Sequence, residues 1–487
     1  MTSIPAVAQT AADLILVNAN IRTLDVKKPR SEAMAVADGK IIAVGTNTAI
    51  RRFARTQTRI IDTRGKLVLP GFNDSHVHFT AIGNQFSHLD MRRMVSRADV
   101  LAEIARYSAF LPKGRWIIAG GLEHEKLMPA GPIPLDMIDK ASPDNPLLIF
   151  VEGGKSIVTN SSALRRAGVT PETKDPSDGV IVRDQAGHPT GIFTGNAAAL
   201  VRRHVPADYA QIWLDIAETA SNYAASLGVT SVQDVHSDDL VEVYRQLDKA
   251  GRLKTRIYEC LGIDAWQKAS VSDIGLVRGG CVKGTTYGIE EEVDDLRRKI
   301  ALADKAGLQV MIHAIGARSN RNALDAFEYA AKVNGRRDRR FRMEHAARAD
   351  ALDLPRFARS NIIASMQPHL FYSGPDYGED YRSIFDAGVM MALGSDASMT
   401  DFNPLFGISA AVNSGSRSLT VEEAVRAYTQ TAAYAEFQEK VKGTLEVRKT
   451  ADFVILSEDI FSIDPRRIVG TKVLLTAVDG RVVYNVL

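Results

Sequence analysis

The sequence predicts an α/β protein: a (β/α)8 TIM-type barrel, a small β-sandwich built from both termini, and a subdomain inserted after the first barrel strand. Three observations lead to this fold class. Short apolar strands alternate with helical patterns from residue 228 onward, which is typical of a parallel barrel. The two ends of the 487-residue chain carry matching hairpin signals. The connection between the first two barrel strands is far too long for a simple crossover.

The β-sandwich is predicted from two similar terminal segments. Residues 33–45 (AMAVADGKIIAVG) and 472–487 (KVLLTAVDGRVVYNVL) each alternate around an Asp-Gly pair, a strong hairpin signal. Two unrelated terminal hairpins are the alternative, but the matching lengths and turns favour one shared sandwich. Further strands are expected at 14–21 and 451–457. The sandwich would therefore comprise residues 1–68 and 440–487.

The barrel is predicted to occupy residues 69–439. Its active site should lie at the C-terminal ends of the strands, as in other barrels of this type. Helical patterns separate most of the strands, for example at 289–306, 317–332 and 421–436. The eight expected strands are KLVLPGFNDSHVHF (66–79) and those at 230–235, 256–263, 280–284, 309–314, 340–346, 362–367 and 389–396.

The inserted subdomain accounts for the long connection between the first two strands. Residues 80–228 contain strand-like runs of their own at 115–121 and 146–154, together with turns rich in Gly and Pro. We therefore expect a subdomain at about 85–200 that covers the barrel mouth.

Composition limits the class of protein. Hydrophobic residues make up 45% and charged residues 24% of the chain, which is ordinary for a soluble globular enzyme. The formal net charge of +2 provides no basic surface for nucleic acid. We find no apolar run of about 20 residues to span a membrane. Two cysteines without a CxxC motif argue against a disulfide scaffold and a cysteine-based zinc site.

We expect a small-molecule substrate and neither a nucleic-acid nor a membrane partner, and a homodimer is compatible with the sequence. The cytoplasm is the expected compartment. The segment AVAQ near the N-terminus resembles the end of a secretory cleavage site, so a periplasmic or secreted location is the alternative.

Polar side chains gather at the predicted strand ends. Four histidines and a carboxylate converging on one barrel rim favour a divalent metal site, and imidazole nitrogen suits zinc. Each residue also has a plainer interpretation alone: a surface histidine pair, a core histidine, an ion-pairing lysine or a turn aspartate. We expect one or two ions, zinc by default. The strand-end residues are His76, His78, Lys283, His313, His345 and Asp396.

The motifs GFNDSHVH, VK, HAIG, EHA and GSDA, in this order, resemble those of the amidohydrolase superfamily. More narrowly, they are similar to amidohydrolase family 3, the YtcJ-like or N-substituted formamide deformylase-like group. The closing segment GTLEVRKTADFVIL and GHPTGIF at 187–193 also resemble that group. The resemblance covers nearly the whole chain.

The resemblance implies a role for each strand-end residue. His76 and His78 would bind the more buried metal, and a carboxylated Lys283 would bridge two metals. A single metal beside an unmodified lysine is the alternative. The remaining two histidines, His313 and His345, would bind the second metal or orient the substrate.

Asp396 would touch the metal and take a proton from the attacking water, then return it to the leaving nitrogen. The implied reaction is hydrolysis of a C–N bond, in an amide or N-acyl amine. A deaminase, an esterase or lactonase, and a non-catalytic binding or regulatory relative are the alternatives.

Several departures from the family pattern concern the substrate. Ala317 stands where the family has an acid, and Lys155 stands where it typically has a histidine. Lys155 is either a cation facing an acidic substrate group or a solvated loop residue. Tyr287 and His369 are candidate substrate contacts, or packing residues near the barrel rim.

Overall fold

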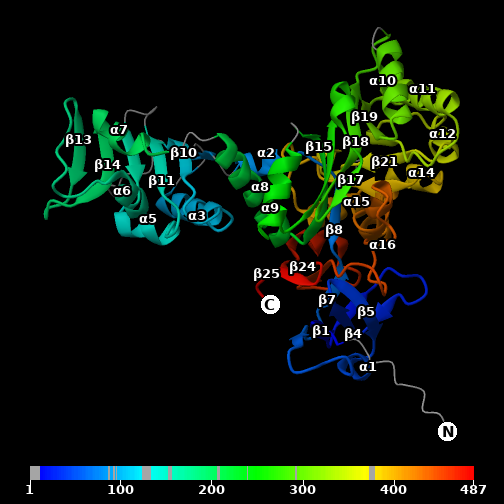
Figure 1. Cartoon of the computed structure of the whole chain (residues 1–487), viewed down its shortest axis with the longest axis horizontal. Coiled ribbons are helices and arrows are strands. Elements are labelled where there is room, and N and C mark those ends of the chain that lie inside the picture. Colours follow the sequence, from blue (N-terminus) through cyan, green and yellow to red (C-terminus); the bar gives the residue numbers. More distant parts are fainter. Residues whose placement is uncertain are drawn as a thin grey trace. The chain divides into compact units, whose positions relative to one another are not determined.

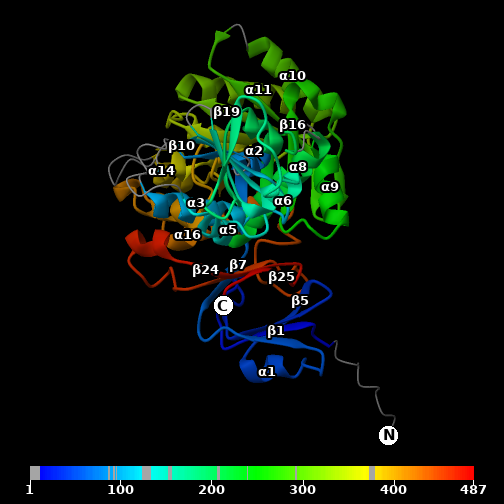
Figure 2. The same cartoon turned by 90° about the vertical axis from the view of Figure 1, so that its left-hand side faces the viewer.

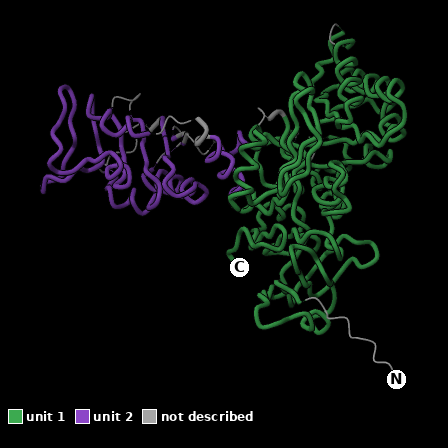
Figure 3. The backbone as a smooth tube through the Cα atoms, viewed as in Figure 1, with its two compact units in different colours: residues 1–79, 224–487 green, residues 80–223 purple. Residues whose placement is uncertain are grey.

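The computed structural model describes residues 11–85, 88–91, 94, 96–122, 133–151, 156–205, 209–237, 240–290, 293–371 and 379–487. The chain forms two compact units (Figure 3). Unit 1 comprises residues 1–79 and 224–487, and unit 2 comprises residues 80–223.

The barrel predicted from the sequence is confirmed in unit 1. Neighbouring strands pair in parallel in sequence order, and a short antiparallel strand, β17 (Ser272–Ile274), adds to β18. Helices surround the strands (Figure 1), and the second view shows the same arrangement (Figure 2). The eight barrel strands are β8 (Phe72–Val77), β15 (Val229–Ser237), β16 (Arg256–Gly262), β18 (Val277–Thr286), β19 (Gln309–Ile315), β20 (Arg342–Ala347), β21 (Ile363–Met366) and β22 (Met391–Leu393).

The barrel helices pack an apolar face against the strands. In α10, Leu296, Ile300 and Ala303 are buried at the spacing of one helical face, and acidic residues occupy the first turn, where the helix dipole favours them. The predicted helix at 421–436 is instead two helices, because Thr429 has non-helical backbone angles. The helices of the barrel are α9 (Val241–Lys249), α10 (Val293–Lys305), α11 (Ala317–Asn334), α12 (Leu354–Arg359), α13 (Pro368–Phe371), α14 (Tyr381–Asp386), α15 (Pro404–Val412), α16 (Val421–Ala427) and α17 (Gln430–Ala435).

The β-sandwich built from both termini is also confirmed. Its two hairpins turn at Asp38-Gly39 and Asp479-Gly480, where all four residues have positive φ, as type I′ turns require. One buried cluster combines N-terminal residues such as Leu16 with C-terminal residues such as Phe453. One sheet contains β1 (Leu14–Val17), β4 (Ala33–Ala37), β5 (Lys40–Gly45) and β6 (Arg59–Asp62); the other contains β2 (Asn20–Arg22), β3 (Arg30–Ser31), β7 (Leu67–Pro70), β23 (Phe453–Leu456), β24 (Val473–Val478) and β25 (Arg481–Asn485).

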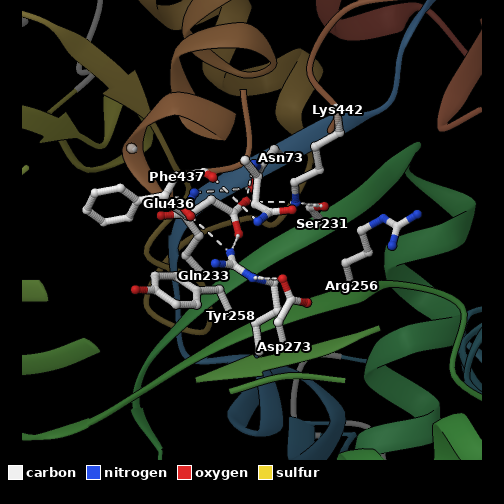
Figure 4. Close-up of polar contacts among 12 residues, drawn as sticks. Asn73, Ser231, Gln233, Arg256, Tyr258, Asp273, Glu436, Phe437 and Lys442 are labelled. Carbon is white, nitrogen blue, oxygen red and sulfur yellow. Dashed lines mark hydrogen bonds and ion pairs between the residues drawn. The ribbon is translucent and has the colours of Figure 1, made fainter. Parts of the chain in front are cut away.

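A buried polar network lies at the N-terminal ends of the barrel strands, opposite the expected active site (Figure 4). Glu436 is its centre: it accepts a hydrogen bond from Asn73 (2.7 Å) and forms ion pairs with Lys442 (2.7 Å) and Arg278 (3.2 Å). These contacts connect the segment after α17, which contains Glu436 and Lys442, to β8 and β18.

The two cysteines are bonded to each other, a pairing that was not predicted from the sequence. A disulfide joins Cys260 on β16 to Cys281 on β18, beside Met311 in a buried cluster. Two cysteines argue against a disulfide scaffold but do not reveal a single bridge, because this pairing depends on the register of β16 against β18.

Unit 2 has its own six-stranded sheet and its own core, in which Trp116 and Phe193 are buried. The strand-like runs noted in the sequence correspond to β10 and β11. The strands are β9 (His88–Asp90), β10 (Ile117–Leu122), β11 (Leu147–Val151), β12 (Ser156–Thr159), β13 (Gly179–Arg183) and β14 (Pro189–Gly195), and the helices include α3 (Arg97–Ser108), α5 (Leu135–Ala141), α6 (Ser161–Ala167) and α7 (Ala199–Arg202). Two helices cross the boundary between the units: α2 (Phe79–Gln85) and α8 (Tyr209–Ser226).

Among the described residues, no helix has both the length and the apolar character needed to cross a membrane.

Candidate metal centre

The first barrel strand and the segment after the last one bring three polar side chains together. His76 lies on β8 and is fully buried, whereas His78, just beyond β8, is partly exposed. Asp396 follows β22, and its Oδ1 lies 3.4 Å from Nε2 of His76 and 3.4 Å from Nε2 of His78. Asp396 has a φ of 60°, an uncommon angle for a non-glycine residue that is found mainly at turns and functional sites.

The three residues fit a divalent metal ion. One ligand atom from each of His76, His78 and Asp396 lies within 4.8 Å of the other two. The Nε2 atom of His76 is buried and has no hydrogen-bond partner, which is costly unless another group such as a metal occupies it. Imidazole nitrogens and a carboxylate oxygen are zinc ligands.

Two further imidazoles lie beside this group. The ring centroid of His345 lies 5.0 Å from that of His76 and 4.3 Å from that of His313. Burial, followed by nearby positive charge, lowers the pKa of His313 to about 4 and that of His345 to about 2. Both rings are therefore neutral at physiological pH, as metal binding requires.

Lys283 is buried on β18, the strand that pairs with β19, which carries His313. No hydrogen bond or ion pair joins its amine to another residue in the part of the chain that the structure describes. Burial lowers the pKa of Lys283 to about 8, so a substantial share of the amine is neutral near physiological pH.

A buried carboxylate that was not predicted from the sequence, Glu344, also contacts the centre. Oε2 of Glu344 contacts Nδ1 of His76. Arg342, itself fully buried, donates to both oxygens of Glu344 at 2.8 and 3.1 Å. Burial would raise the pKa of Glu344, but Arg342 and His76 outweigh it and hold the pKa well below its usual range. Glu344 therefore fixes the His76 ring with Nε2 directed toward Asp396.

Backbone geometry explains why Glu344 was missed. Strict alternation along a strand would direct Glu344 and His345 to opposite faces. His345 and Ala346 have φ values of 69° and 49°, which interrupt the alternation at the end of β20. Both Glu344 and His345 consequently approach His76. The sequence EHA contains no signal for this break.

Burial and charge also act on the other groups at His76. Burial would raise the pKa of Asp396, but the adjacent imidazoles of His76 and His78 hold it well below its usual range. Burial and Lys283 would lower the pKa of His76, yet Glu344 and Asp396 raise it. A metal at Nε2 would therefore compete with a proton.

The predicted substrate contacts Tyr287 and His369 differ from each other in their surroundings. Tyr287 is 71% exposed, and its ring centroid lies 6.5 Å from that of His313. His369 is buried, its Nε2 lies 3.1 Å from the carbonyl oxygen of Asn403, and its ring stacks on Phe406. Lys155 lies outside the described residues.

Comparison with known proteins identifies the family of the chain. The sequence model of the amidohydrolase family matches residues 59–484. The protein LONG AFTER FAR-RED 3 of Arabidopsis thaliana is 32% identical, over 99% of this chain and 94% of its own. The N-substituted formamide deformylase of Arthrobacter pascens is 27% identical, over 97% of this chain and 98% of its own. The resemblance inferred from the motifs is thereby confirmed.

A solved structure shares the fold. Atrazine chlorohydrolase TrzN from Arthrobacter aurescens TC1, complexed with zinc, superposes with a TM-score of 0.57 at 15% identity. The alignment covers 97% of this chain and 95% of that one.

Proposed function

The chain belongs to the amidohydrolase family, and from this premise we propose that it is a metal-dependent hydrolase that cleaves a C–N bond of a small molecule, in an amide or an N-acyl amine. The observation that carries the proposal is the convergence of His76, His78 and Asp396 within 4.8 Å at the C-terminal rim of the barrel. The deformylase relative supports N-substituted formamides as the first substrates to try.

The residues divide into two groups of proposed ligands. His76, His78 and Asp396 would hold one divalent ion, zinc by default. His313, His345 and a carboxylated Lys283 would complete a site for a second. A bound ion supplies Lewis acidity and lowers the pKa of a coordinated water to about 7.

Asp396 is the proposed proton carrier. Its Oδ1 lies 3.4 Å from Nε2 of both His76 and His78, near enough that it would accept a proton from the attacking water. The protonated carboxyl then donates that proton to the leaving nitrogen, which departs as a neutral amine. Glu344 contacts Nδ1 of His76 and would hold the His76 ring in the same orientation during the reaction.

Carboxylation of Lys283 is a separate proposal. The free-base amine would attack CO2, forming one N–C bond and releasing one proton to give a carbamate. Its burial and lowered pKa support this, because both increase the neutral fraction of the amine. The carbamate would supply oxygen ligands that an ammonium group cannot.

The substrate contacts remain proposals as well. We favour Tyr287, which is exposed beside His313. His369 would influence the substrate indirectly, by positioning Asn403, because its Nε2 already contacts the carbonyl oxygen of Asn403. Lys155 would face an acidic substrate group.

Turnover by an Asp396→Asn variant tests the proposal. The variant keeps the side-chain shape but removes the basic oxygen, so kcat should fall by roughly 10²–10⁴-fold while metal content is largely kept. The substrates would be N-substituted formamides, N-acyl amino acids, anilides, cyclic amides and aryl esters. The matched control is Asp386→Asn on α14, which should behave as wild type.

Each outcome identifies a different function. Near wild-type turnover by Asp396→Asn means that another group carries the proton. Turnover of esters alone favours an esterase or lactonase, and ammonia release from an amidine favours a deaminase. Absence of bound metal and of any turnover favours a non-catalytic relative.

A further inference from the structure

The barrel closes between its first and last strands at the metal centre itself. β8 and β22 are the two ends of the barrel sheet, which otherwise runs through consecutive parallel neighbours. We call the junction of residues 74–78 with residues 394–397 the barrel seam. Asp396 N donates to the carbonyl oxygen of His76 (2.8 Å), and His78 N donates to that of Ala397 (2.6 Å).

One buried carboxylate spans the barrel seam. Oδ1 of Asp74 accepts hydrogen bonds from the backbone N–H of His76 (3.1 Å) and of Ser395 (3.0 Å). Its Oδ2 accepts from Ser395 N as well (3.2 Å). Asp74 is fully buried, so losing it would leave two buried donors without their acceptor.

The two strands approach closely around this carboxylate. A Cβ added at Gly394 would lie 2.5 Å from His76 N and 2.8 Å from Oδ1 of Asp74. On its other side, the Gly394 carbonyl accepts a hydrogen bond from the Tyr428 hydroxyl (3.2 Å). A side chain at Gly394 would therefore force the strands apart.

We propose that Asp74 is a positioning residue that sets Asp396 against His76 and His78. These three residues all belong to the barrel seam, and their nitrogen–oxygen distances of 3.4 Å depend on how tightly it closes. Loosening the Asp74 contacts would move Asp396 relative to the imidazoles without removing any of the three side chains. The importance of this effect for catalysis rests on the proposed function, but the geometry does not.

Hydrogen–deuterium exchange of the full chain, without added metal, tests the positioning directly. We compare wild type with Asp74→Ala and Asp74→Asn. In Asp74→Ala, exchange of peptides covering 74–80 and 391–400 should rise about tenfold, while β19 stays protected. In Asp74→Asn, the amide retains one acceptor, so the rise should be smaller and confined to 391–400.

A matched control separates positioning from general loss of stability. Asp304 is also buried, but it pairs with Arg337 and Arg339 away from the barrel seam. Asp304→Ala should increase exchange around α10 and leave both seam peptides unchanged.

Cobalt affinity gives a second readout that is independent of hydrolysis. Co²⁺ should bind Asp74→Ala about 10–100-fold more weakly than wild type, with Asp74→Asn in between. Unchanged seam exchange or cobalt affinity in Asp74→Ala overturns the proposal, as does a rise in exchange that is uniform along the chain rather than concentrated in the seam peptides. If Asp74→Ala does not fold, an Asp74→Asn variant that matches wild type in both exchange and cobalt affinity overturns it equally. Failure to hydrolyse any C–N substrate would affect the proposed function alone.

Discussion

His76 stands between two carboxylates that contact its opposite ring nitrogens. Glu344 contacts Nδ1, and Oδ1 of Asp396 lies 3.4 Å from Nε2. Both carboxyl groups have pKa values held below their usual range, Glu344 chiefly by Arg342 and Asp396 by His76 and His78, in each case against the opposing effect of burial. Glu344 orients the imidazole ring of His76. Asp396 lies beside Nε2 of that ring, the nitrogen expected to bind the metal.

We predict that Glu344→Gln weakens metal binding about 10–100-fold, because a neutral amide makes His76 a poorer donor and holds its ring less firmly. Competition with a coloured chelator measures this affinity. Glu328→Gln is the matched control, since Glu328 pairs with Arg356 on the outside of the barrel. Equal affinity in Glu344→Gln and wild type would show that Glu344 has no effect on the ligand.

The sequence placed the histidines, Lys283 and Asp396 at strand ends because apolar runs with a polar last residue are visible without a structure. It could not identify Glu344, since the break in alternation arises from positive φ at His345 and Ala346. The role of Asp74 could not be predicted either, because no sequence pattern marks a carboxylate that accepts hydrogen bonds from two backbone N–H groups.

The strands and helices follow the sequence closely where hydrophobic periodicity is clear. Seven barrel strands and both terminal Asp-Gly hairpins lie where their patterns predict. The strand expected at 66–79 is instead two strands, β7 in the β-sandwich and β8 in the barrel. The helix expected at 421–436 is broken near Thr429, although its apolar spacing continues across the break. The Cys260–Cys281 bridge depends on the register of β16 against β18, which periodicity does not determine.

The disulfide should stabilise the barrel measurably. The cysteines are 21 residues apart, and closing a loop of that length contributes about 3 kcal/mol to the free energy of unfolding. Treatment with a dithiol reductant should therefore lower the melting temperature. A Cys260→Ala/Cys281→Ala variant should melt at the lower temperature and be insensitive to reductant. Two titratable thiols in unreduced, denatured wild type would contradict the bridge.

In unit 1, the barrel and the β-sandwich are joined by buried charges. Arg256 at the start of β16 pairs with Asp452 beside β23 at 2.6 Å and also contacts Asp479 of the C-terminal hairpin turn. Arg256 appears with the neighbouring network in Figure 4. Asp452 is almost fully buried, and its charge is stabilised mainly by Arg256 and then by a hydrogen bond from the backbone N–H of Asp479 (2.8 Å).

This junction should make folding stability depend on acid. Burial raises the pKa of Asp452, but Arg256 outweighs burial and leaves the pKa below its usual value. A depressed folded-state pKa contributes stability above the unfolded value of about 4, and that contribution is lost as the pH falls below it. Asp452→Asn should therefore be less stable than wild type at pH 7, with a smaller difference at pH 3.

Urea unfolding at both pH values measures this difference. Glu458→Gln, at a surface ion pair with Arg467 in the same sandwich, is the control and should change stability little. A deficit of Asp452→Asn that is equal at both pH values would show that the loss comes from packing rather than from charge.

The metal content of the 487-residue protein, purified without chelators, tests the central claim most directly. Elemental analysis should find one to two divalent ions per chain in wild type, and His76→Ala/His78→Ala should lose at least one of them. Circular dichroism of both proteins verifies that the variant is folded. Wild-type protein without bound metal, and without uptake of added zinc, would contradict the account, as would a folded double variant with undiminished metal content.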